Sequence, residues 1–76
     1  MRDLVEFIVQ ELVDDPDTVS VSEDRDDRGS RYRVRVAPDD MGKVIGRAGR
    51  TAKAIRTVVR AAAHRRGEGA IVDIED

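Results

Sequence analysis

The sequence feature that most constrains the fold is a strict two-residue alternation over residues 31–36. Arginine occupies positions 31, 33 and 35, whereas Tyr32, Val34 and Val36 occupy the positions that follow them. Because successive side chains of a β-strand point to opposite faces, this alternation predicts a strand with one apolar and one charged face. A chain of 76 residues without cysteine has no disulfide to stabilise it, so the apolar face must contribute to a small core.

Two further segments predict strands before and after this one. Val19 and Val21 alternate with polar residues in residues 18–23, and residues 70–74 are mostly apolar. Residues 24–30 are polar and include Gly29, which favours a loop that joins the first two strands as an antiparallel hairpin. About 33 residues separate the second strand from the third, a length suited to a parallel crossover connection.

Three helices are predicted from apolar periodicity and from flanking residues. Apolar side chains at positions 4, 5, 8, 9, 12 and 13 predict an amphipathic helix that ends before Pro16. A brief helix is expected over residues 40–45, and Asp39 and Asp40 offer carboxylates to cap it. A longer helix is expected over about residues 50–64. Its core side is predicted to comprise Ile55, Val58, Val59 and Ala62, and its exposed side Lys53, Arg56 and Arg60.

The predicted order is therefore helix, strand, strand, helix, helix, strand, in one domain over residues 1–76. This order gives an α+β fold, a three-stranded mixed sheet with three helices on one face. No run of about 20 apolar residues is present, and Asp3 and Glu6 lie where a signal peptide would carry basic residues. The chain is expected to be soluble, unprocessed and, without cysteine, cytoplasmic.

The charged face of the central strand has a structural explanation. Asp73 and Glu75 share the outward parity on the neighbouring parallel strand. Cross-strand ion pairs with these carboxylates are therefore expected for Arg33 and Arg35, in preference to contacts with a ligand.

The net charge of −2 conceals a sharp division along the chain. Residues 1–27 contain ten acidic residues and two arginines, a net charge of −8, whereas residues 43–66 contain eight basic residues and no acidic residue, a net charge of +8. This segregation predicts one strongly positive surface on a globally acidic protein, which suits a nucleic-acid partner. A solvated helix face with a chance excess of charge is the alternative explanation.

The two helices of the basic half are joined by a G-x-x-G sequence, Gly46-Arg47-Ala48-Gly49. Glycines let the backbone bend sharply and let another backbone approach closely, and the following helix begins with free N–H groups and a partial positive charge. Arg47 and Arg50 add cations at the same point, so this segment is predicted to hold phosphates. Val44 and Ile45, just before it, are suited to walling a groove for bases. By itself, a G-x-x-G turn is also an ordinary connection between two helices.

Two other classes of function, a protein-interaction module and an enzyme, differ in how well the sequence fits them. A protein-interaction module stays open, in which the glycine loop is only a turn and the alanine-rich last helix builds a dimer contact. An enzyme is disfavoured because the sequence has no Walker A or G-x-G-x-x-G motif and no nucleophile with an evident base; His64 is expected to act at a helix end instead. No cofactor is expected, and no metal, since the acidic residues 23–27 lack recognisable ligand spacing.

The segment from Val44 to Arg50, followed by Ile55, resembles the V-I-G-x-x-G-x-x-x-x-x-I signature of KH domains. The element order resembles the type II arrangement, and residues 42–63 resemble the bacterial KhpA family of stand-alone KH proteins. The resemblance covers essentially the whole chain. It implies a cytoplasmic RNA chaperone or post-transcriptional regulator without catalytic activity. It also implies a homodimer and a larger KH-containing partner of the Jag (KhpB or EloR) type.

KH domains bind about four nucleotides of single-stranded RNA, holding the backbone at the glycine loop and reading bases in an adjacent groove. The scarcity of aromatic residues, only Phe7 and Tyr32, suits such a groove better than a base-stacking platform. Residues 46–49 are expected at the phosphates, Val44 and Ile45 at the groove floor with Val36 at its border, and Arg56 and Arg60 in the wider positive field. The predicted RNA-binding residues are Lys43, Val44, Ile45, Gly46, Arg47, Ala48, Gly49, Arg50 and Lys53.

Overall fold

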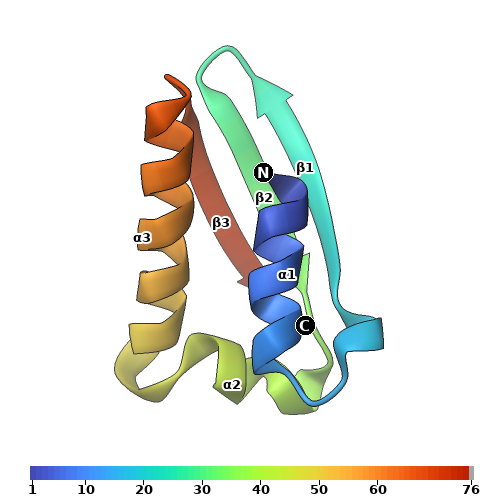
Figure 1. The fold of residues 1–76 in the computed structure, drawn as a ribbon. Coiled ribbons are helices and arrows are strands. Elements are labelled where there is room, and N and C mark those ends of the chain that lie inside the picture. Colours follow the sequence, from blue (N-terminus) through green and yellow to red (C-terminus); the bar gives the residue numbers. More distant parts are fainter. Residues whose placement is uncertain (76) are drawn as a thin grey trace.

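A computed structural model describes residues 1–75, which form three α-helices and three strands in the predicted order (Figure 1). Short 3₁₀ turns at Pro16–Thr18, Pro38–Asp40 and Arg47–Gly49 lie between these elements. The elements are α1 (Arg2–Leu12), β1 (Ser20–Asp26), β2 (Gly29–Arg35), α2 (Met41–Ile45), α3 (Arg50–Arg65) and β3 (Gly69–Glu75).

The sheet has the strand order β1-β2-β3, with β2 in the centre. β1 and β2 are antiparallel, with Ser20 opposite Arg35, and β2 and β3 are parallel, with Arg35 opposite Glu75. The predicted mixed sheet is thus confirmed. The predicted extent of the hairpin loop is wrong, because the two strands continue until Asp26 pairs with Gly29. Backbone pairing does not need apolar side chains, and at this end polar residues such as Glu23 and Ser30 join the two strands.

The core lies between the sheet and the helices, and Figure 1 shows α1 and α3 side by side across one face of the sheet. Tyr32 and Val34 point into this core from β2, as the alternation predicted. On α3 the buried positions are spaced three and four apart, as one stripe of a helix requires. They are Ala52, Ile55, Val59 and Ala63.

Val58 was predicted to belong to the core side of α3, and this prediction is wrong. Its side chain is 51% exposed, because position 58 lies beside the buried stripe rather than on it. On α1, Val5 and Val9 are fully buried, whereas Leu4 and Leu12 are each 38% exposed. The helices therefore keep apolar side chains at the surface of the molecule.

An arginine from each long helix bonds to an edge strand. The guanidinium of Arg2 on α1 donates to the carbonyl oxygen of Val21 on β1, at 2.9 Å. Nε of Arg56 on α3 donates to the carbonyl oxygen of Val72 on β3, at 3.1 Å. Arg56 was predicted to lie on the exposed side of α3, but this bond holds it partly buried against the sheet.

The helix-free face of the sheet carries the three arginines of β2, each in an ion pair. Arg35 pairs with Glu75 at 3.4 Å, as predicted. Arg33 was predicted to pair with Asp73 or Glu75, but it pairs with Asp24 on β1 at 3.5 Å, and Asp73 pairs with Arg31 at 3.0 Å. Both changes are diagonal contacts, which a long arginine side chain reaches as easily as the directly opposite residue.

A polar cluster closes the hairpin end of the core. The carboxylate of Glu23 accepts hydrogen bonds from Ser30 Oγ at 2.6 Å and from the Tyr32 hydroxyl at 3.4 Å. Arg25 lies 3.6 Å from this carboxylate and also pairs with Glu68, just before β3. The cluster therefore joins all three strands at one end of the sheet.

None of the helices within residues 1–75 has the length and apolar character needed to cross a membrane.

Candidate functional site

The glycine loop, defined here as residues 46–49, connects α2 to α3 at the end of the sheet opposite the hairpin (Figure 1). Gly46 has φ 76° and ψ 173°, and its N–H donates to the Gly42 carbonyl at 2.9 Å. A Cβ atom at this position would lie 2.7 Å from Cβ and 2.9 Å from the backbone nitrogen of Thr51. The first turn of α3 therefore packs directly against Gly46, and only glycine fits.

The second half of the loop has a left-handed backbone. Ala48 has φ 55° and ψ 26°, and Gly49 has φ 75° and ψ 12°. Ala48 is the single non-glycine residue with positive φ among residues 1–75. Gly49 N–H donates to the Gly46 carbonyl at 3.1 Å, which closes the turn. A left-handed alanine is energetically unfavourable, and such strain is often found at functional sites.

Four cations, within the loop and along α3, are exposed and have no acidic partner among the described residues. Within residues 1–75, Arg47, Arg50, Lys53 and Arg60 make no ion pair with a carboxylate. The first turn of α3 adds the partial positive charge of a helix N-terminus. The glycine loop and the exposed side of α3 therefore form a positive surface.

Lys43 differs from these cations because it already has a partner. Its ammonium group, on α2, pairs with the carboxylate of Asp14, which follows α1. This hydrogen bond raises the pKa of the Lys43 ammonium above its ordinary value. Lys43 and Asp14 are 29 residues apart in the sequence, and sequence analysis did not bring them together.

The two apolar residues before the loop have different surroundings. Ile45 is half-buried, whereas Val44 is fully buried in the core. Val44 was predicted to line the floor of a surface groove, and this detail is corrected: its side chain supports the loop from beneath and has no exposed surface. Val36, predicted at the groove border, is likewise buried.

Asp40 has an unexpected position. It was predicted to cap the brief helix, but it makes no side-chain capping bond there and is only 2% exposed. Its carboxylate instead accepts the backbone N–H groups of Asp14 at 3.2 Å and Asp15 at 3.1 Å. The local sequence signals an acidic cap but carries no sign of a partner 25 residues away. Asp40 thus fixes the segment after α1 against the start of α2.

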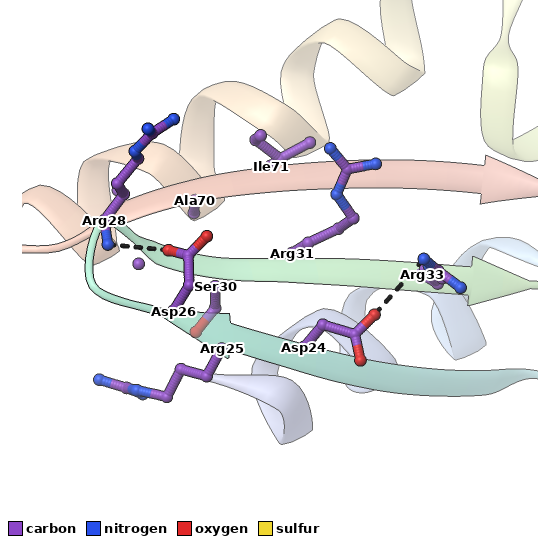
Figure 2. Close-up of a pocket in the computed structure, with 11 residues that line it drawn as sticks. Asp24, Arg25, Asp26, Arg28, Ser30, Arg31, Arg33, Ala70 and Ile71 are labelled. Atoms are coloured by element: carbon purple, nitrogen blue, oxygen red, sulfur yellow. Dashed lines mark hydrogen bonds and ion pairs between the residues drawn. The ribbon is translucent and has the colours of Figure 1, made fainter.

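A hollow of about 430 Å³ lies on the outer face of the hairpin, at the other end of the sheet (Figure 2). Two of its arginines already have carboxylate partners, since Arg33 pairs with Asp24 and Arg31 pairs with Asp73 of β3. Asp26 accepts the backbone N–H of Arg28 at 2.8 Å. No predicted site residue lies there. Among residues 1–75, no three acidic or histidine side chains are grouped so that they would hold a metal ion.

The order of elements, the mixed sheet and the glycine loop between α2 and α3 define a KH domain of the type II arrangement. A family model described as "KhpA/KhpB, KH domain" matches residues 2–74, and the chain belongs to this family.

Curated relatives agree with this assignment. The chain is 53% identical to an "RNA-binding protein KhpA" of Halalkalibacterium halodurans over all of both proteins. It is 50% identical to a protein of the same name from Clostridium acetobutylicum, over 97% of this chain and 99% of the relative. A Streptomyces coelicolor protein of that name is 49% identical over the whole chain and 92% of its own length. No solved structure matches the chain.

Proposed function

We propose that this protein binds single-stranded RNA, with the glycine loop holding the phosphate backbone. The observation that carries the proposal is the left-handed turn at residues 48–49, flanked by the exposed cations Arg47, Arg50 and Lys53, which have no acidic partners among residues 1–75. The names of the relatives add independent support, since each is called an RNA-binding protein.

The proposed contacts follow from the geometry of the loop. The absent side chain at Gly49, with open space where its Cβ would stand, leaves room for a phosphate to approach the backbone. Arg47 and Arg50 flank this position with charge-assisted donors, and the start of α3 directs its partial positive charge to the same side. Lys53, one turn into α3, would contact the next phosphate, and Ile45 offers the apolar surface nearest to the loop.

RNA bound in this way would be recognised mainly through its backbone. With three or four phosphates neutralised, log K should fall against log[salt] with a slope of about −2 to −3. The family resemblance extends the proposal to a role as an RNA chaperone or post-transcriptional regulator in the cytoplasm, without catalytic activity.

A protein-interaction role is the second candidate, and the exposed apolar residues of the helix layer favour it. Phe7 on α1 is 61% exposed and Val58 on α3 is 51% exposed. The bond from Arg56 to Val72 shows which side of α3 faces the edge strand β3. Val58 lies on the opposite side of the buried stripe of α3, which is the side toward α1. We propose that this surface joins two copies of the chain. A larger KH protein of the Jag (KhpB or EloR) type is a second proposed partner, supported by a family description that includes KhpB.

The double substitution Arg47→Asp with Ala48→Asp tests the RNA proposal. It places two carboxylates at the proposed phosphate site, and aspartate tolerates the left-handed backbone at position 48. We expect the affinity for a single-stranded oligoribonucleotide, measured by fluorescence anisotropy, to fall at least about 10-fold because charge attraction dominates such binding.

The matched control is Ser22→Asp with Arg28→Asp, which changes the total charge by the same amount at two exposed positions outside the glycine loop, one on β1 and one in the hairpin turn. This control should bind within about 2-fold of the wild type, because charges farther than a Debye length from the RNA are screened. Circular dichroism establishes that both variants are folded. If the folded loop variant binds RNA as tightly as the wild type, the glycine loop does not hold the phosphates.

A further inference from the structure

We infer that Asp14 is a built-in competitor of RNA: its carboxylate occupies Lys43 where a phosphate would otherwise bind, and it thereby lowers the affinity of the site. The inference rests on the proposed function, because it concerns the same positive surface. It assigns a role to an acidic segment, residues 14–17, that the RNA proposal leaves unused.

The position of Lys43 makes it a natural phosphate contact. It lies on α2, three residues before Gly46, and its side chain is 45% exposed. In this structure its ammonium group is bonded to Asp14, whose side chain is 79% exposed. A carboxylate oxygen and a phosphate oxygen make the same charge-assisted bond to an ammonium group. Both partners are open to solvent, so the pair can exchange for a phosphate without any change in the core.

The acidic segment is held in place rather than left to move freely. The buried carboxylate of Asp40 binds the backbone N–H groups of Asp14 and Asp15. Pro16 follows at once, and the hydroxyl of Thr18 donates to the Asp15 carboxylate at 2.5 Å. Because these bonds fix the backbone, the Asp14 side chain stays within reach of Lys43. Asp40 is therefore a positioning residue for the competitor.

The expected size of the effect follows from the exposure of the pair. Ion pairs between exposed side chains are weak, equivalent to about a 1.5- to 5-fold change in an equilibrium constant. RNA can therefore displace Asp14, but its apparent affinity is reduced by about this factor. Once Lys43 is released, it can neutralise one more phosphate.

Asp14→Asn is the informative substitution, because it removes the charge and keeps the backbone N–H that Asp40 binds. We expect it to raise the affinity for a fluorescein-labelled, mixed-sequence RNA of about eight nucleotides by about 2- to 5-fold at about 50 mM salt. The gain should shrink at about 200 mM salt. Asp17→Asn is the matched control: it makes the same charge change on the same exposed segment, and within residues 1–75 Asp17 has no ion pair. Its gain should stay below about 1.5-fold.

A double-mutant comparison separates action through Lys43 from a general charge effect. In a Lys43→Gln background, Asp14→Asn should give no more gain than Asp17→Asn. Two results would overturn the inference while leaving RNA binding intact. One is that Asp14→Asn still raises RNA affinity more than Asp17→Asn does in the Lys43→Gln background. The other is that the two substitutions raise RNA affinity equally in the wild-type background.

The ion pair has a readout that does not need RNA. Titration of the Lys43 side chain by NMR should show a lower pKa in Asp14→Asn than in the wild type, because the bond to Asp14 raises that pKa. If the pKa shows this change and yet neither protein binds the RNA, the proposed function fails, and the competitor role fails with it. If the pKa is unchanged by the substitution, the pairing itself is refuted.

Discussion

Gly42 lies in the first turn of α2 and Gly46 directly follows this helix, yet the space around the two glycines differs. A Cβ atom added to Gly46 would lie only 2.7 Å from the Cβ of Thr51, and the φ of Gly46 is 76°. Around Gly42, no atom lies within 4 Å of that position. One glycine is therefore required by packing and backbone geometry, whereas the other is not.

Gly46→Ala should destabilise the fold by about 2 kcal/mol or more, since its backbone conformation, φ 76° and ψ 173°, is essentially restricted to glycine and costs another residue about 1–3 kcal/mol, and the contact with Thr51 adds to this cost. Gly42→Ala should stabilise it by about 0.5 kcal/mol, because alanine is the better helix former. Urea denaturation of the two variants measures both effects. Equal stabilities would show that Thr51 does not restrict position 46.

At the residue scale, the sequence revealed where the glycine loop lies but not how its residues are used. The two glycines and the cations beside them form a local pattern, and local patterns can be read without a fold. The left-handed backbone of Ala48 and the burial of Asp40 depend on partners elsewhere in space. The ion pair of Lys43 could not be predicted for the same reason, since its partner Asp14 comes close to it only in the folded chain. The RNA contacts of this loop stay a prediction.

At the scale of elements, the hairpin is closed by polar bonds instead of apolar packing. Glu23 on β1 bonds Ser30 and Tyr32 on β2, and Arg25 links the same cluster to Glu68. The hydrogen bond from Ser30 holds the pKa of the Glu23 carboxyl below its ordinary value of 4.5, and the bond from Tyr32 and the charge of Arg25 act in the same direction.

This shift predicts an acid-sensitive contribution to stability. A carboxyl whose pKa is lower in the folded state stabilises the fold fully above its unfolded value, near pH 4.5, and loses this contribution as the pH falls through the folded value. The difference in unfolding free energy between the wild type and Glu23→Gln should therefore shrink as the pH is lowered below about 4.5. Ser30→Ala, which removes the main donor, should reduce the same pH dependence. A difference that stays constant down to pH 2 would contradict this assignment.

The order and type of the elements could be predicted because periods of two and of about 3.6 residues are properties of the chain itself. The lengths of the strands could not, since β1 and β2 continue through charged residues whose backbone pairs and cross-strand side-chain bonds exist only in the folded sheet. The placement of Val58 failed for a related reason. A helix with apolar residues at 55, 58, 59 and 62 has two possible buried stripes, and the sheet selects the one through Ala52 and Ala63.

At the scale of the whole molecule, two kinds of surface lie on one helix layer. The glycine loop and the exposed side of α3 are positive, and α1 and α3 also carry the exposed apolar side chains of Phe7 and Val58. Exposed apolar patches on small proteins commonly mark contacts with other proteins. RNA binding and association of two copies can thus use different surfaces.

Val58→Lys tests the proposed dimer, with Ile71→Lys as its matched control. Both residues are exposed and apolar, at 51% and 46%, but Ile71 lies on the helix-free face of the sheet. We expect the lysine at position 58 to raise the dimer dissociation constant at least about 10-fold, because a charge would be buried in an apolar contact. The control should leave it unchanged. Sedimentation velocity measures both, and dissociation by the control alone would move the dimer contact to the sheet.

The bonds from Arg2 to Val21 and from Arg56 to Val72 affect whether the edges of the sheet can pair with strands of other chains. β1 and β3 are its outer strands, and the outward backbone groups of such strands can recruit further strands and start fibril growth. On each side, a guanidinium already occupies one of the carbonyl oxygens that an incoming strand would need. The helices thus protect the sheet against aggregation at both margins, in addition to the charged side chains that β1 and β3 carry themselves.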